Sequence, residues 1–115
     1  MKQYEVVRAL SALAQESRLA LFRLLVRRGP EGFTPGMIAN RLDIPGPTLS
    51  FHLKELQNAG LLWARREGRN LYYAVRFDRM KTLVGFLTDE CCSHASSACD
   101  SDCNPIAVPA RRRSA

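Results

Sequence analysis

Residues 34–60 of this 115-residue chain, TPGMIANRLDIPGPTLSFHLKELQNAG, decide the fold because they predict two short helices joined by a tight turn. Thr34 can cap the first helix, and Pro35 suits its first turn. The residues IPGP then interrupt the helical pattern, and a second helix extends until Gly60 ends it. Two short helices separated by a Gly/Pro turn are typical of a helix-turn-helix.

The second helix of this pair has an apolar and a polar side. Leu49, Leu53 and Leu56 recur at helical spacing and form an inner stripe, whereas Ser50 and Lys54 fall on the other side. A helix-turn-helix places the first turns of its second helix against base edges in the major groove of DNA. The candidate DNA contacts from this helix are therefore Thr48, Ser50, Phe51, His52 and Lys54.

Two of these candidates also have a purely structural interpretation. A lone histidine on a helix, such as His52, is more often a structural hydrogen-bonding group than a ligand or a catalyst. Phe51 could belong to the core, but the leucine stripe already occupies the inner face of the helix. An exposed Phe51 that contacts a thymine methyl group is therefore favoured.

Two strand-like runs follow the second helix. LLWARRE and NLYYAVRF flank the residues EGRN, which predicts a β-hairpin with a glycine turn. After a helix-turn-helix such a hairpin is a wing, and its arginines suit backbone phosphate, with Arg69 near the tip placed to enter a minor groove. Trp63 is most simply explained by packing within the hairpin. The wing candidates for DNA contact are Arg65, Arg66, Arg69 and Asn70.

Two helices are predicted ahead of the helix-turn-helix. Residues 3–14 place apolar residues at helical spacing, and residues 18–29 form a helix that is apolar around much of its circumference. Ser17 can cap this second helix, and Gly29 can stop it after a cationic last turn. The apolar positions of the first helix are Val6, Val7, Leu10 and Leu13.

A last helix is predicted over residues 78–90, with Asp78 as its cap. The fold class is therefore mainly α with a small β-hairpin, a winged helix-turn-helix that spans residues 1–90. Residues 91–115 are rich in Ser, Ala, Asp and Pro and are expected to form a flexible, cysteine-containing tail. The apolar stripe of the last helix consists of Met80, Leu83, Val84 and Leu87.

The charge of the chain is concentrated in its folded part. Net charge is +6, and residues 1–88 contain 14 Lys and Arg against 7 Asp and Glu. A basic domain favours an anionic partner, with double-stranded DNA first, and a solvated basic surface is the alternative. The N-terminus of the chain is polar, and no apolar run is as long as a membrane span. A cytoplasmic protein without a membrane partner is therefore expected.

Residues 47–73, PTLSFHLKELQNAGLLWARREGRNLYY, resemble the recognition helix and wing of the ArsR/SmtB family of bacterial metal-sensing repressors. The predicted order of elements over residues 3–90 is also similar to that family. The resemblance implies a homodimer built from the first and last helices. It also implies that the metal-free dimer represses at an operator and that the inducer ion releases it.

The chain departs from the familiar metal sites of this family. The first helix of the helix-turn-helix, residues 34–42, contains no cysteine, whereas the usual arsenic sensors carry a Cys-x-Cys pair there. The last helix contains no histidine, so the ligand pattern of the zinc sensors is missing. Residues 86–92, FLTDECC, and the cysteines that follow resemble a subgroup that senses trivalent arsenic through C-terminal cysteines.

All four cysteines of the chain lie within residues 87–103, LTDECCSHASSACDSDC. Trivalent arsenic and antimony are thiophilic and take three thiolates, which suits Cys91, Cys92 and Cys99, with Cys103 as a spare or substitute ligand. Cys91 and Cys92 are adjacent, so they can share one ion only if the last helix ends or frays before them. Cys99 can then fold back, because closing a short flexible loop costs little entropy.

Other functions remain open at this stage. Four thiolates could hold zinc or cadmium, with His94 as a further ligand, although no two cysteines have Cys-x-x-Cys spacing. A thiol-redox switch or a metal carrier would also use the tail, but a carrier has no need of a basic helix-turn-helix. No enzyme is expected, because the chain has neither a nucleotide-binding glycine motif nor a catalytic triad in a structural context.

Overall fold

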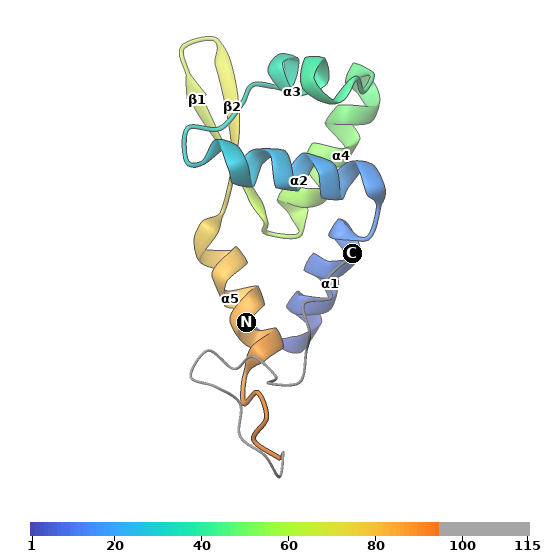
Figure 1. The fold of residues 1–115 in the computed structure, drawn as a ribbon. Coiled ribbons are helices and arrows are strands. Elements are labelled where there is room, and N and C mark those ends of the chain that lie inside the picture. The colour runs from blue at the N-terminus through green and yellow to red at the C-terminus, as the bar shows by residue number, and fades with distance from the viewer. Residues whose placement is uncertain (95–115) are drawn as a thin grey trace.

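The predicted helix-turn-helix is formed by α3, Pro35–Leu42, and α4, Gly46–Asn58. These helices belong to a computed structural model that describes residues 1–94 (Figure 1). Thr34 caps α3 as predicted, since its hydroxyl accepts a hydrogen bond from the Met37 backbone N–H at 3.3 Å. Asp43 then takes a left-handed conformation with φ 55° and turns the chain into α4. The fold class is confirmed as a winged helix-turn-helix.

The core forms around the inner face of α4. Leu49, Leu53 and Leu56 are all buried, as the leucine stripe predicts. They belong to one apolar cluster with Leu21 and Leu25 of α2, Glu16–Arg28, and with Ile38 of α3. Burial of each such side chain contributes about 1.5–3 kcal/mol, so this cluster fixes how α4 is rotated about its axis.

The wing consists of β1, Leu62–Glu67, and β2, Asn70–Val75, paired antiparallel from Leu62↔Val75 to Glu67↔Asn70. Gly68 supplies the turn with φ 65°. Phe33 extends this sheet by an isolated bridge to Tyr73, which pattern reasoning missed. The Phe33 N–H donates to the Tyr73 carbonyl at 3.0 Å, and the Tyr73 N–H donates back at 2.9 Å. The loop before α3 is therefore tied to the wing.

Two predicted helix caps are wrong. Helix α2 begins at Glu16 after an extended Gln15, whose side chain accepts a hydrogen bond from the Arg18 N–H at 2.9 Å, so Ser17 lies inside the helix. Helix α5, Phe77–Thr88, follows β2 with Arg76 alone between them and therefore begins before Asp78 can cap it. In both places the path of the preceding segment outweighs the preference of Ser or Asp for the cap.

The first and last helices lie at the opposite end of the molecule from the wing tip (Figure 1). In α1, Gln3–Leu13, Val6 is buried but Val7 and Leu10 are exposed, and in α5 only Leu83 of the predicted stripe is fully buried. We call the exposed apolar side chains of these two helices the terminal apolar face. They are Tyr4, Val7, Leu10, Val84, Phe86 and Leu87. Among the described residues, no helix is long and apolar enough to cross a membrane.

The junction between the loop and the wing depends on a glycine. Gly32 has φ +73°, and a Cβ placed there would collide with the Tyr73 carbonyl oxygen. We therefore expect Gly32→Ala to destabilise the fold by about 1–3 kcal/mol, measured by urea unfolding. Gly36→Ala is the matched control, since the nearest atom to its Cβ would be the Thr34 hydroxyl oxygen at 4.0 Å. Equal stability of the two variants would contradict this account of the junction.

Candidate nucleic-acid interface

Helix α4 exposes a contiguous set of side chains opposite its buried leucines. Thr48, Ser50, Phe51 and Lys54 are all exposed, and the Phe51 ring is 56% accessible despite its size. An exposed aromatic ring among polar side chains provides apolar contact area for a partner of this face. The structure therefore brings four of the five predicted α4 contacts onto one surface.

His52 is the exception, because its side chain is only 6% exposed. Its Nδ1 atom lies 3.3 Å from the Nη1 atom of Arg18, a residue of α2. An arginine can only donate, so His52 accepts this hydrogen bond as a neutral ring with its proton on Nε2. Its burial favours the structural interpretation of His52 over a contact in the groove. His52 acts as a structural group that holds α4 against α2.

Arg18 joins three helices at this point. Its Nε–H donates to the Ala12 carbonyl at 2.7 Å, in the last turn of α1, while its Nη1 reaches His52 on α4. The carbonyls of a last helical turn have no partner within their own helix, so this contact satisfies one of them. Helix α1, which carries part of the terminal apolar face, is thereby tied to α4. No periodicity in the sequence could reveal this pairing.

The wing residues divide into two groups. Arg66, Arg69 and Asn70 are exposed around the turn. Arg65 is half-buried, and its side chain donates to the Glu31 carbonyl at 3.2 Å. Its Nε lies 3.6 Å from the Glu67 carboxylate, and its guanidinium stacks 5.0 Å from the centre of the Tyr72 ring. Arg65 is therefore engaged in holding the wing to the loop before α3. The tip residues are the ones that a DNA backbone could reach.

A pair of arginines near the wing was not predicted. The guanidinium groups of Arg28 and Arg41 stack on the ring of Phe33, 4.7 and 4.8 Å from its centre. Phe33 is buried, whereas both arginines are exposed. Stacking of this kind restricts both arginine side chains. The Nε–H of Arg28 also donates to the Gly32 carbonyl at 3.0 Å, and its Nη1 lies 3.5 Å from the Glu31 carboxylate. The two arginines add positive charge between α2, α3 and the wing, in keeping with a polyanion partner.

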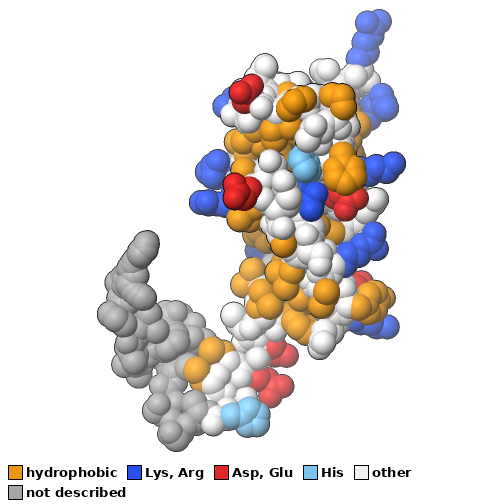
Figure 2. Space-filling view, turned by 90° about the vertical axis from the view of Figure 1, so that its right-hand side faces the viewer, with side chains coloured by type: hydrophobic (Ala, Val, Ile, Leu, Met, Phe, Trp, Pro, Cys, Tyr) orange, Lys and Arg blue, Asp and Glu red, His pale blue; other side chains and the backbone are white. Residues whose placement is uncertain are grey.

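Figure 2 shows cationic side chains along both edges of the body, and hydrophobic side chains at its upper end as well as in its lower half. An ion pair between Glu5 and Arg79, with 3.7 Å between Oε2 and Nη2, links α1 to α5. The two helices that carry the terminal apolar face are thus joined to each other.

The last helix ends before Cys91 and Cys92, as the sharing of one ion between these two residues requires. Helix α5 ends at Thr88, and Glu90 and Cys92 take positive φ values of 55° and 63°. The Sγ atoms of Cys91 and Cys92 are consequently only 3.5 Å apart. Cys99 and Cys103 lie outside the described residues. Within residues 1–94 no group of three or more His, Cys, Asp or Glu side chains is placed to hold a metal ion.

Comparison with known proteins agrees with this geometry. Residues 13–62 match a helix-turn-helix domain family. The HTH-type transcriptional regulator YceK of Bacillus subtilis is 40% identical over 77 residues, which are 66% of this chain and 76% of that protein.

Two solved structures resemble the whole described fold. One is the homodimeric winged helix-turn-helix DNA-binding domain of a possible ArsR-family transcriptional regulator from Mycobacterium bovis, with 31% identity, a TM-score of 0.59, and coverage of 82% of this chain and 87% of that one. The other is the transcriptional repressor BigR from Xylella fastidiosa, with 29% identity and a TM-score of 0.60, over 74% of this chain and 84% of that one.

The contact between Arg18 and His52 predicts a dependence of stability on pH. Burial, and then the Arg18 charge, lower the pKa of His52 from its usual 6.5, while Glu55 opposes them. Because the unfolded chain takes up this proton first, the stabilisation is complete above about pH 6.5 and is lost as pH falls toward the folded-state pKa. Urea unfolding at pH 7.5 and pH 5 should show wild type losing more stability than His52→Gln, which keeps an acceptor but does not titrate. Identical losses would contradict the contact.

Proposed function

We propose that this chain, which belongs to the ArsR/SmtB family of winged helix-turn-helix transcriptional regulators, is an operator-binding repressor that trivalent arsenic or antimony releases from DNA. It would act as a homodimer in the cytoplasm, without a catalytic role. The observation that carries the DNA-binding part is the exposed face of α4 beside a basic wing, both held by one core. The inducer is inferred from the chemistry of the C-terminal cysteines.

The groove contacts follow from how the core orients α4. With Leu49 and Leu53 turned inward, Ser50 and Lys54 point outward from the same turns. A helix presented in this way enters the major groove, where hydroxyl groups meet bases or phosphates and Phe51 meets a thymine methyl. Arg66 and Arg69 then reach the backbone alongside. BigR, a repressor of similar fold, supports repression as the outcome.

Dimerisation is supported by the terminal apolar face. Six large apolar side chains exposed on two neighbouring terminal helices form a surface that a soluble monomer seldom leaves uncovered. The M. bovis domain of similar fold is a homodimer. A second copy packed on this face would place two α4 helices on one side of the pair, as two half-sites one helical turn apart require.

The closeness of the Cys91 and Cys92 sulfurs suits a soft-ion inducer in the reduced protein. Two thiolates about 2.3 Å from a shared tetrahedral metal are about 3.8 Å apart, close to the 3.5 Å between the Cys91 and Cys92 sulfurs. Cys99, with Cys103 as a substitute, would supply the third thiolate that trivalent arsenic or antimony needs. Zinc or cadmium held by four thiolates, or a redox change of the same cysteines, is the competing interpretation.

The position of the thiols suggests how they control DNA binding. Cys91 lies three residues after Thr88, the last residue of α5, and its N–H donates to the Thr88 carbonyl at 3.0 Å. Tying the tail to these sulfurs would change the end of the helix that carries Val84 and Leu87 of the terminal apolar face. A shift of the dimer misaligns the two α4 helices. A coupling free energy of about 1–3 kcal/mol, usual for allostery, weakens DNA binding about 5–150-fold.

The wing arginines give a quantitative test of DNA binding. Each phosphate contact that is lost should lower the slope of log affinity against log salt by about 0.9. We therefore expect Arg66→Gln and Arg69→Gln each to weaken binding to all DNA sequences and to reduce the slope by about 1. Fluorescence anisotropy at several salt concentrations measures both quantities. Unchanged slopes in both variants would show that the wing tip does not contact DNA.

Cys91→Ser tests the inducer site. In a Cys103→Ser background, which removes the substitute ligand, it should leave DNA affinity unchanged but abolish arsenite binding, because the two remaining thiolates cannot replace the three that trivalent arsenic takes. Equilibrium dialysis of the reduced protein with arsenite measures the bound ion directly. Ser93→Ala is the matched control in the same turn and should bind arsenite like wild type. Retained arsenite binding by Cys91→Ser in this background would place the site elsewhere.

A further inference from the structure

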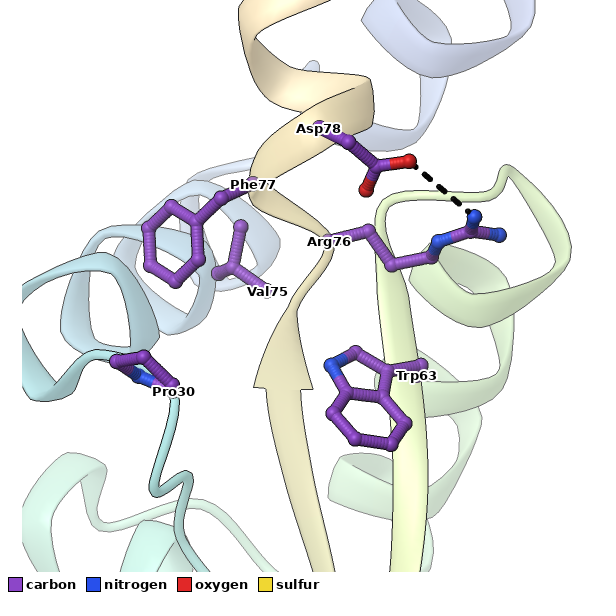
Figure 3. Close-up of a pocket in the computed structure, with 6 residues that line it drawn as sticks. All are labelled: Pro30, Trp63, Val75, Arg76, Phe77 and Asp78. Atoms are coloured by element: carbon purple, nitrogen blue, oxygen red, sulfur yellow. Dashed lines mark hydrogen bonds and ion pairs between the residues drawn. The ribbon is translucent and has the colours of Figure 1, made fainter.

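An open cavity of about 480 Å³ lies where the wing passes into α5. Pro30, Trp63, Val75, Arg76, Phe77 and Asp78 line it (Figure 3). Its size is within the range of small-molecule sites, about 300–1,000 Å³. Phe77 precedes Val84 by seven residues of α5, or about 10 Å. The cavity is therefore separate from the part of the terminal apolar face that α5 provides.

The walls of the cavity are apolar and partly aromatic. Figure 3 shows Trp63 on β1 across from Pro30, with Phe77 and Val75 on the Pro30 side. Trp63 is 43% exposed, although it is one of the larger apolar side chains of the chain and sits near the base of the hairpin. The expected packing within the hairpin thus leaves much of the indole uncovered. Its surface can stack with a planar ring.

One end of the cavity is polar. The Arg76 guanidinium and the Asp78 carboxylate face each other, with 3.4 Å between Nη2 and Oδ2 (Figure 3). Both side chains are well exposed, so this pair contributes little to stability. The ion pair with Asp78 shows that the Arg76 guanidinium can pair with a carboxylate at this place. An incoming carboxylate could exchange for Asp78 and pair with Arg76 in two-pronged geometry.

We propose that this cavity binds a small aromatic carboxylate, with its ring against Trp63 and its carboxylate on Arg76 in place of Asp78. Arg76 is the one residue between β2 and α5, and its backbone N–H donates to the Leu61 carbonyl at 2.8 Å. A ligand held there contacts the wing through Trp63 and the dimer helix through Phe77. On the proposed function, it would be a second input to DNA binding, independent of the cysteines.

Trp63 is the single tryptophan of the chain, so its fluorescence reports on this site without DNA. We would titrate the full-length reduced protein with benzoate at constant ionic strength. Cyclohexanecarboxylate and benzyltrimethylammonium serve as probes that lack the aromatic ring and the negative charge, respectively. A saturable change with benzoate at millimolar concentration is expected, with cyclohexanecarboxylate at least several-fold weaker and no response to the cation.

Variants assign the binding to these residues. Arg76→Gln should weaken benzoate binding about tenfold, which is the loss of about 1.4 kcal/mol. Asp78→Asn should strengthen it, because Arg76 then has no competing carboxylate. Arg23 is an exposed arginine on α2, so Arg23→Gln removes the same charge elsewhere and should leave the affinity for benzoate unchanged.

Three results would overturn the proposal: no saturable response to benzoate in wild type, a stronger response to the cation than to benzoate, or equal affinity in Arg76→Gln and Arg23→Gln. Circular dichroism of each variant verifies folding before the titration. The fluorescence titration contains no DNA, so it tests ligand binding in the cavity independently of operator binding. A further titration of labelled DNA with and without benzoate then measures the effect on DNA affinity.

Discussion

The burial of one side of α4 is the constraint on which the other features depend. Leu49, Leu53 and Leu56 pack against α2 and α3, and this packing leaves α4 a single rotation about its axis. The contact between Arg18 and His52 reinforces that rotation and ties α4 to the end of α1. The exposed polar face of α4 is thus a consequence of the core. A change in the core would turn that face away from a groove.

The two ends of the molecule serve two different kinds of contact. The wing tip and the outer face of α4 expose polar and basic side chains, whereas α1 and α5, at the other end of the fold (Figure 1), expose apolar ones. A DNA-binding dimer needs this division, because charged phosphate and an apolar partner surface cannot be satisfied by the same patch. Cys91 and Cys92 follow α5 in the chain. On the proposed function, an ion bound by the cysteines would act on DNA through the arrangement of the two protomers.

Local signals in the sequence were sufficient for the elements. Thr34 and Pro35 start α3 where predicted, and the glycine at position 68 forms the hairpin turn. Features that depend on distant partners were not predicted. The contact of His52 with Arg18 joins residues 34 positions apart, and the isolated bridge at Phe33 requires Tyr73.

The sites show the same limit. The terminal apolar face includes Val7 and Leu87, which belong to the apolar stripes predicted for the first and last helices, and both are exposed. Arg65 was expected at the DNA backbone but is engaged with Glu31 and Glu67. For Cys91 and Cys92 the sequence set only a condition, that the last helix must end before them, and α5 does end at Thr88, with the two sulfurs 3.5 Å apart.

The most direct measurement is an anisotropy titration of the reduced protein onto labelled DNA from upstream of its own gene, at fixed salt and with non-specific competitor DNA. Arsenite, antimonite, zinc and cadmium would then be added separately. The account predicts a specific complex with two protomers per site that arsenite or antimonite releases and zinc does not. Release by zinc or cadmium alone would indicate instead that the cysteines of the tail form a tetrahedral metal site. Absence of a specific complex would contradict the central claim that this chain is an operator-binding repressor.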